Sequence, residues 1–328
     1  MKGDATLFES MLVCPACNGE LVISSDQMAC IACRLDYGRL NDWCVDLLPS
    51  GLLEDERIPW QERQQEMDEW YENLIAQASS ATSCFLNDYV PLKPVLEGLT
   101  GVVLDLGGGN GIARHFLPAD VQHVVVDPSM QWLEPAWASL AADFPCLADA
   151  PRFVRGVGEH LPFRPESFDV VLALWSLNHV LRPGDVFREV HRVLKPGGRF
   201  LIVLEDMEPA MADLVTRRFQ RGALRQVATA LRADLPATSR AVFDHMLPGG
   251  RVRDTLIVLM AKIRHHLLGR RWPVQADHIQ IAESEIHTWI DSCFEVARRE
   301  WVGHYLNYEL AKYPGVYDAV PAVSRQSV

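Results

Sequence analysis

The sequence of 328 residues lacks several features that would place it in a membrane or on a nucleic acid. Residues 1–12 contain no apolar core of the kind that a signal peptide needs. The most apolar later run, residues 256–263, is far too short to cross a bilayer. The net charge of −12 argues against a general coating of nucleic acid, although a local basic face could still bind it. We therefore expect a cytoplasmic protein without membrane insertion.

A glycine-rich stretch at residues 102–111, Val-Val-Leu-Asp-Leu-Gly-Gly-Gly-Asn-Gly, lacks the hallmarks of two common nucleotide-binding motifs. Gly107, Gly109 and Gly111 are spaced Gly-x-Gly-x-Gly, whereas dinucleotide binding requires Gly-x-Gly-x-x-Gly, and no lysine follows for a phosphate loop. The pattern still predicts a buried strand that enters a tight turn before a helix. Glycine suits this turn because it accepts positive φ and lets a ligand approach the backbone.

A second apolar run, residues 121–127, ends at Asp127. We expect it to form the strand beside the first. A carboxylate at the end of such a strand can accept hydrogen bonds from both hydroxyls of a ribose. The two patterns together predict a ligand that contains a ribose and need not contain a pyrophosphate.

These stretches and three later ones resemble the class I S-adenosylmethionine-dependent methyltransferases. Residues 102–111 resemble motif I of that family. The later matches occur in the family's order: Glu159-His160-Leu161-Pro162-Phe163 resembles its E-x-L-P-F segment, Phe168-Asp169-Val170-Val171 its fourth strand, and Leu194-Lys195-Pro196-Gly197-Gly198 the turn before its fifth. The resemblance covers roughly residues 101–204 and, more weakly, the C-terminal end. It implies that S-adenosylmethionine is the cofactor.

The resemblance also implies which residues contact that cofactor. In many relatives an acid two positions before the Glu159 equivalent accepts the adenine amino group. Val157 occupies that position here, so backbone groups near Glu159 and apolar packing from Met130 are the expected replacements. The expected cofactor residues are Asp105, Gly107, Gly109, Asp127, Met130, Gly158, Glu159 and Leu174.

Strand and helix patterns alternate through this region and predict the fold class. Continuous apolar strands separated by helices indicate an α/β fold, a parallel sheet with helices on both faces. The resemblance implies that this is the Rossmann-like sheet of the class I methyltransferases. We expect strands at 102–106, 121–127, 153–156, 168–174, 199–204, 294–302 and 305–312, and helices at 112–116, 130–142, 183–194 and from Ser284. The last two strands resemble the antiparallel hairpin that closes the family's seven-stranded sheet.

Half of the eight cysteines form one pattern. Cys14-x-x-Cys17 and Cys30-x-x-Cys33 are two knuckles with the spacing of a closed tetrahedral Zn²⁺ site. The alternatives are chance cysteines or a redox pair. The remaining cysteines show no ligand spacing, and we expect ordinary buried thiols at Cys44, Cys84, Cys146 and Cys293.

The two knuckles predict an N-terminal zinc ribbon, for which short strands are expected at 20–25 and 35–43. The ribbon resembles that of ribosomal RNA guanine methyltransferases and ribbons fused to other methyltransferases. Its role is open between a structural or substrate-docking platform and an RNA-reading finger. The expected domains are 1–48 zinc ribbon, 49–98 linker and helices, 99–205 core, 206–280 helical lid, 281–313 core completion and 314–328 tail.

Two helical regions flank the core. Helices expected at 60–78 and 89–99 lie over the cofactor in the resembled family. The lid at 206–280 carries a basic excess, and Arg217 and Arg221 recur at helical spacing. They are candidates for binding an anionic substrate, with a solvated basic face as the alternative. Tyr305 is a further candidate substrate residue.

Methyl transfer needs close positioning and sometimes a base. His179, just beyond the fourth expected strand, is the candidate catalytic base, and a packing or capping role is its alternative. We expect a methyltransferase for a small-molecule or glycan acceptor. The alternatives are an RNA methyltransferase that uses the ribbon, and a non-catalytic scaffold that binds the cofactor. The acceptor atom and the oligomeric state are not predicted.

Overall fold

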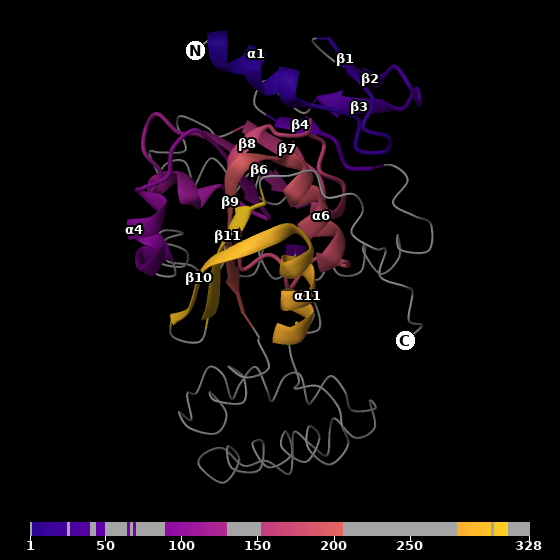
Figure 1. Cartoon of the computed structure of the whole chain (residues 1–328). Helices are drawn as coiled ribbons and strands as arrows, with labels where there is room; N and C mark the ends of the chain where they lie inside the picture. The colour runs from indigo at the N-terminus through magenta and orange to yellow at the C-terminus, as the bar shows by residue number, and fades with distance from the viewer. Residues whose placement is uncertain are drawn as a thin grey trace, which may run out of the picture.

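The computed structural model describes residues 2–24, 27–39, 44–49, 64–65, 68–69, 89–129, 152–205, 281–302 and 305–313. Within these ranges eleven strands form one sheet in the order β1-β2-β3-β4-β7-β6-β5-β8-β9-β11-β10 (Figure 1). None of the described helices is both long and apolar enough to cross a membrane. The expected lid at 206–280, the helix at 130–142 and the tail lie outside the described residues.

Seven of the strands form the methyltransferase-like part of the sheet. Five pair in parallel: β5 (Val102–Leu106), β6 (Gln122–Asp127), β7 (Arg152–Arg155), β8 (Phe168–Leu174) and β9 (Leu194–Leu204). The antiparallel hairpin of β10 (Phe294–Val302) and β11 (Tyr305–Lys312) continues from β9. The predicted fold class is confirmed. The Leu194–Gly198 turn is taken into β9, with a shift of register between Phe168 and Val170 of β8.

Helices cover both faces of this sheet because each strand sends alternate apolar side chains to opposite sides. On one face, α6 (Pro183–Val193) and α11 (Glu283–Cys293) pack against residues such as Leu104 and Phe200. On the other, η1 (Val90–Leu92), α4 (Lys93–Leu96) and η2 (Ile112–His115) pack against Val103 and Leu172. Figure 1 shows α4 on the opposite side of the strands from α6 and α11.

The ribbon has more regular structure than the sequence patterns predict. It comprises α1 (Lys2–Met11), β1 (Leu21–Ile23), β2 (Gln27–Cys30), β3 (Asp36–Arg39) and β4 (Cys44–Asp46), whose strands pair antiparallel in order. The α1 helix was not expected, nor were separate strands at β2 and β4. Strand β2 ends at Cys30, the first residue of the second knuckle, and β4 has only three residues, so neither is long enough to show a clear alternating pattern.

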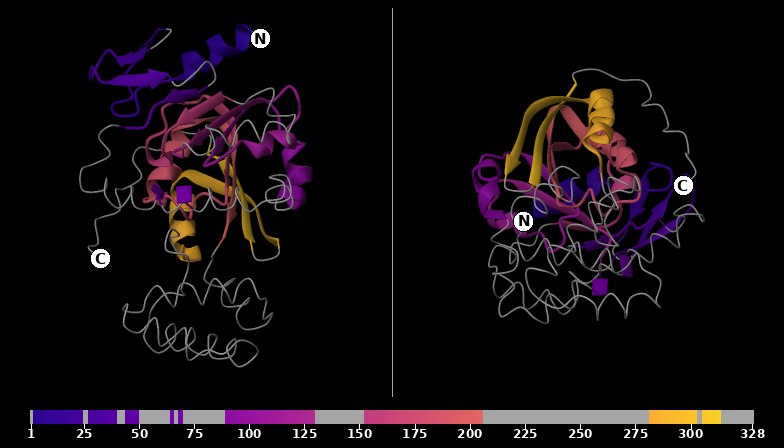
Figure 2. Two further views of the ribbon diagram at one scale, coloured as in Figure 1. Left: turned by 180° about the vertical axis from the view of Figure 1, so that it is seen from behind. Right: turned by 90° about the horizontal axis from the view of Figure 1, so that it is seen from below.

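The ribbon and the core share one sheet and one hydrophobic interior. Strand β4 pairs in parallel with β7, so that Cys44 lies opposite Phe153. Phe8, Met28 and Leu47 of the ribbon belong to the same buried cluster as Leu104 of the core. Figures 1 and 2 show the ribbon packed against the core beside β7. Cys44 and Cys293 are buried, as expected, whereas Cys84 and Cys146 lie outside the described residues.

Candidate active site and metal centre

The glycine turn follows β5 at the carboxyl edge of the sheet. Gly107, Gly109 and Gly111 have φ of 66°, 52° and 73°, a backbone region that favours glycine. The Gly107 amide donates to the Val126 carbonyl at 2.7 Å, which ties the turn to β6. A Cβ on Gly107 would lie 2.5 Å from the Cβ of Ser176, so a larger residue cannot occupy this position without a shift.

Asp127, at the end of β6, is fixed against this turn. Its Oδ2 accepts a hydrogen bond from the Gly109 amide at 2.9 Å, and its Oδ1 accepts one from the Ser129 amide at 2.8 Å. Burial raises the pKa of Asp127 to about 6, while the bonds from Ser129 and Gly109 act in the opposite direction. Each oxygen retains a second lone pair, so the carboxylate can still accept hydroxyl groups of a ligand.

A second carboxylate, which sequence reasoning missed, lies close to this position. The Ser129 hydroxyl donates to Asp68 Oδ1 at 2.6 Å. Asp68 belongs to the region where the sequence predicts a helix over the cofactor, and this contact brings that region to within two residues of Asp127. Asp68 is one of several acids in this region, and no pattern in the sequence distinguishes it from the others.

Asp105 lies beneath the glycine turn. Its side chain is buried, and its Oδ2 lies 3.2 Å from Nε2 of the buried His123. A Cβ on Gly108 would lie 2.5 Å from the Asp105 carboxyl carbon. The carboxylate therefore supports the turn from the β6 side, and its direct contact with a cofactor stays a prediction.

Gly158 and Glu159 form a short turn, η4 (Gly158–His160), after β7. Glu159 Oε1 accepts hydrogen bonds from the amides of Leu181 at 2.8 Å and Arg182 at 3.2 Å. This carboxylate thus holds the loop that enters α6. The predicted roles of Gly158 and Glu159 in cofactor binding stay predictions.

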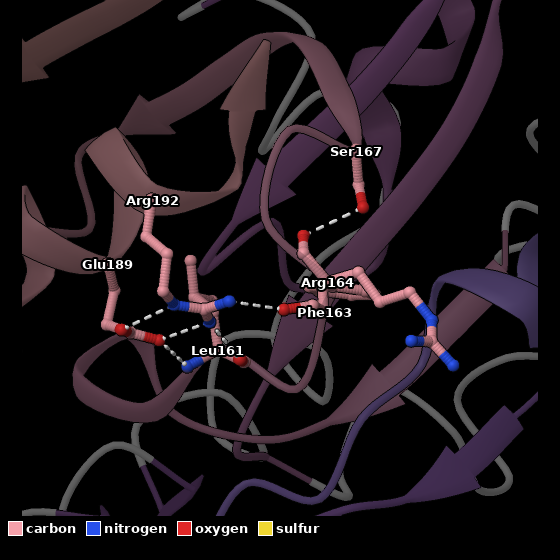
Figure 3. Close-up of polar contacts among 6 residues, drawn as sticks. All are labelled: Leu161, Phe163, Arg164, Ser167, Glu189 and Arg192. Carbon is pink, nitrogen blue, oxygen red and sulfur yellow. Dashed lines mark hydrogen bonds and ion pairs between the residues drawn. The ribbon is translucent and has the colours of Figure 1, made fainter. Parts of the chain in front are cut away.

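The segment after Glu159 is held from two sides (Figure 3). From α6, Arg192 donates to the carbonyls of Leu161 and Phe163, and Glu189 accepts from the Leu161 amide at 2.9 Å. Arg164 points away from Arg192, and its Nε donates to the Ser10 carbonyl of the ribbon at 2.9 Å. Helix α6 and the ribbon therefore position the same segment.

An aromatic cluster lies at the carboxyl end of β8. Trp175 has φ of 57°, a conformation that costs a bulky residue on the order of 1–3 kcal/mol. Its ring centroid is 5.1 Å from that of Tyr89 and 5.6 Å from that of Tyr305, both edge-to-face. Within the described part of the chain, the Trp175 indole nitrogen and the Ser176 hydroxyl are buried without a hydrogen-bond partner. Tyr305, predicted to contact substrate, belongs to this cluster.

Trp175 is not among the residues that the sequence predicts for the site. The available signal was the position of an aromatic residue directly after the fourth strand, at the edge where ligands bind in such sheets. The positive φ that singles out Trp175 leaves no trace in the sequence.

His179 follows the cluster by one turn. Its Nε2 lies 3.5 Å from Oε1 of Glu205, which follows β9. A carboxylate at this distance can orient an imidazole and stabilise its protonated form. The geometry is compatible with a base, and the catalytic role of His179 stays a prediction.

The other predicted residues separate into two groups. Leu174 is buried and lines a cavity of about 60 Å³ between η1 and α4 on one side and strands β8, β9, β10 and β11 on the other. Its contact with a cofactor also stays a prediction. Met130, Arg217 and Arg221 lie outside the described residues.

The structure brings the four predicted metal ligands together. The sulfur atoms of Cys14, Cys17, Cys30 and Cys33 all lie within 4.8 Å of one another. A tetrahedron with Zn–S bonds of about 2.3 Å places its sulfurs about 3.8 Å apart, so this donor set fits Zn²⁺. The Cys33 amide lowers the pKa of Cys30 to about 6, which favours a thiolate at that position.

Comparison with known proteins places the similarity in the core. A family model described as a methyltransferase domain matches residues 104–202. The demethylmenaquinone methyltransferase of Clavibacter sepedonicus is 40% identical over 101 residues, 30% of this chain and 39% of that protein. The C-methyltransferase UbiE of ubiquinone and menaquinone biosynthesis from Azotobacter vinelandii is 48% identical over 68 residues, 21% of this chain and 26% of that protein. The chain thus spans well under half the length of these curated relatives.

Solved structures are similar at lower identity. The 1,6-didemethyltoxoflavin-N1-methyltransferase of Burkholderia thailandensis, with 1,6-didemethyltoxoflavin and S-adenosylhomocysteine bound, is 17% identical with a TM-score of 0.46. The alignment covers 90% of this chain and 99% of that one. The PH0226 protein of Pyrococcus horikoshii is 20% identical with a TM-score of 0.43, over 72% and 92% of the two chains. The core of this protein has the class I methyltransferase fold, and residues 104–202 match the methyltransferase domain family.

Proposed function

We propose that this protein is an S-adenosylmethionine-dependent methyltransferase that acts on a small-molecule or glycan acceptor. The observation that carries the proposal is the fixed carboxylate of Asp127 beside the turn at Gly107–Gly109. Amides of Gly109 and Ser129 hold that carboxylate at the carboxyl edge of the sheet, where it would accept hydrogen bonds from both hydroxyls of a ribose. The match of residues 104–202 to a methyltransferase domain supports the same conclusion.

The residues present fit the proposed cofactor, which supplies an activated methyl group when bound. Backbone at the glycine turn gives the close approach that its ribose and amino-acid portion require. The protein's own contribution is to hold donor and acceptor in line at the carboxyl ends of β5 and β8. His179, oriented by Glu205, would take the proton that the acceptor loses.

The proposal includes a structural Zn²⁺ held by Cys14, Cys17, Cys30 and Cys33. Four thiolates leave no open coordination position for catalysis. The ribbon's strands continue the sheet and its apolar residues join the core, which supports a structural role for the metal.

Two kinds of evidence support the proposal of a small-molecule acceptor. The aromatic cluster of Trp175, Tyr89 and Tyr305 places apolar rings at the carboxyl end of β8, and apolar and aromatic side chains typically line small-molecule sites. Similar proteins bear names that specify small-molecule acceptors, namely demethylmenaquinone and 1,6-didemethyltoxoflavin.

The test is a transfer assay with S-adenosylmethionine labelled in its methyl group. Zinc-replete protein is incubated with a low-molecular-mass cell extract and, separately, with total RNA. We expect label in the small-molecule fraction and its loss in Asp127→Ala. Label in RNA would overturn the acceptor class, and no transfer to either fraction would favour the scaffold alternative.

A further inference from the structure

Three observations single out Trp175 on the acceptor side of the proposed site. The residue has a left-handed backbone conformation although it is large and aromatic. Its indole N–H is buried and has no hydrogen-bond partner among the residues that the structure describes. Its ring is partly exposed and lies edge-to-face with Tyr89 and Tyr305, which reach it from distant parts of the chain.

The cluster directly adjoins the glycine turn. Ser176 follows Trp175, and its Cβ lies only 2.5 Å from the position that a Cβ on Gly107 would take, so the two sides of the site meet at this point. The Trp175 amide donates to the Val203 carbonyl at 2.9 Å, which anchors the strained residue to β9. A backbone outlier held this firmly beside a proposed cofactor site is typical of a functional position.

The unpartnered indole N–H defines the chemistry of a ligand. A buried donor without a partner is costly, and a ligand atom with a lone pair would satisfy it. An ammonium group cannot fill this role because it has no lone pair to offer. The edges and faces of three aromatic rings favour a planar ring over a saturated chain.

We infer that Trp175 is the specificity-determining residue for the acceptor, and that the acceptor is an aromatic ring bearing an oxygen or nitrogen that accepts a hydrogen bond from the indole N–H. This inference rests on the proposed function, because it assigns the acceptor side of the same site. It adds to that function a substrate class and the residue that selects it.

The test measures binding of simple ring probes to the full-length, zinc-replete protein loaded with S-adenosylhomocysteine. Equilibrium dialysis compares 1-naphthol, naphthalene, decahydro-1-naphthol and methyl glucoside. We expect 1-naphthol to bind about tenfold more tightly than naphthalene, through the added hydrogen bond. 1-Naphthol should also bind more tightly than decahydro-1-naphthol by a similar factor, because only its ring makes aromatic contacts.

Two substitutions at Trp175 separate its two contributions. Trp175→Phe keeps an aromatic ring and removes the N–H, so the preference for 1-naphthol over naphthalene should disappear while the preference over decahydro-1-naphthol remains. Trp175→Leu should remove both preferences. Trp289→Phe is the matched control, because Trp289 packs against Phe187 on the opposite face of the sheet.

Titration with S-adenosylhomocysteine distinguishes the two levels of failure. If the wild-type protein does not bind it, the proposed function is overturned. If it binds and 1-naphthol does not, or if all probes bind alike, only the present inference is overturned. Preferential binding of methyl glucoside, or an unchanged preference in Trp175→Phe, would also contradict it.

Discussion

Two borders of the proposed cofactor site differ in how completely their polar groups are satisfied. At the ribbon junction, the backbone of Val13 and Arg164 pairs with that of Pro162 and Met11, and Arg192 donates to two carbonyls. At the aromatic border, the indole N–H of Trp175 and the Ser176 hydroxyl are buried and find no hydrogen-bond partner in the described ranges. The ribbon junction therefore resembles the interior of a folded protein, in which buried polar groups are paired.

The difference indicates which border holds position and which binds a ligand. A buried polar group is normally paired, so each exception calls for an explanation. Among the described residues of the ribbon, no buried polar side-chain atom lacks a partner, which agrees with a structural role for the ribbon junction. The aromatic border retains donors that a ligand would satisfy. The following substitutions test this division, from the largest expected effect to the smallest.

The double substitution Cys14→Ser, Cys17→Ser should have the largest effect on stability. Structural zinc sites contribute on the order of 10 kcal/mol of folding free energy, and this ribbon shares its interior with the core. We expect one calorimetric unfolding transition, with a midpoint lowered by about 10 °C or more. Two transitions, with the core transition unchanged, would show that the ribbon is an independent module and would contradict the account that it shares its interior with the core.

Phe163→Ala should come next, because this side chain is fully buried where the ribbon meets the core. Loss of a buried phenylalanine typically costs about 3–5 kcal/mol. Denaturant unfolding measures the change. Arg155→Met is the control at the same junction: its partly exposed ion pair with Asp46 should contribute less than about 1 kcal/mol. Equal costs for the two variants would contradict the account of a shared interior.

His179→Gln should lower turnover about a hundredfold with the Michaelis constant nearly unchanged, since a positioned base contributes about 10²–10⁴-fold. Glu205→Gln, which removes the orienting carboxylate, should have a smaller effect in the same direction. Steady-state kinetics of both variants supply the measurement. An unchanged turnover in His179→Gln would leave a packing or capping role for this residue.

The affinity for S-adenosylmethionine should fall at acidic pH. Asp127 has a pKa raised to about 6 from 3.8, so in the free protein it takes up a proton as the pH falls through 6. Ribose hydroxyls favour the ionised form, so binding should release protons and weaken about tenfold per pH unit below 6. Calorimetry in buffers of different ionisation enthalpy measures the release. Asp127→Asn should show neither effect, and a wild-type affinity that is flat from pH 7 to 5 would exclude this carboxylate as the anchor.

The same pKa shift has an opposite consequence for folding. Because the folded protein holds this proton more tightly than the unfolded chain, Asp127 favours the folded state below about pH 4, and this contribution is lost as the pH rises through 6. As the pH falls from about 6 to 4, protonation of Asp127 should therefore raise the free energy of unfolding and lower the affinity for the cofactor.

The core of the fold could be predicted from the sequence because its strands are short apolar runs that end at distinctive residues. The limits of β5, β8, β10 and β11 agree with the predicted ranges. The junction could not be predicted, because pairing of β4 with β7 joins residues more than a hundred positions apart and depends on no local pattern.

The candidate site divides in the same way. Asp127 and the four ribbon cysteines could be identified because their chemistry requires a particular residue type at a particular spacing. Trp175 could not, because its importance depends on a backbone angle and on two tyrosines brought to it by the fold.

The most direct test of the central claim is calorimetric titration of zinc-replete protein with S-adenosylmethionine at pH 7.5, beside Asp127→Ala. The account predicts saturable binding that the substitution weakens at least about tenfold, which corresponds to about 1.4 kcal/mol. Trp289→Phe, remote from the site, should bind like the wild type. Absence of binding by the wild type, or equal affinity in Asp127→Ala, would contradict the assignment of this turn as the cofactor site.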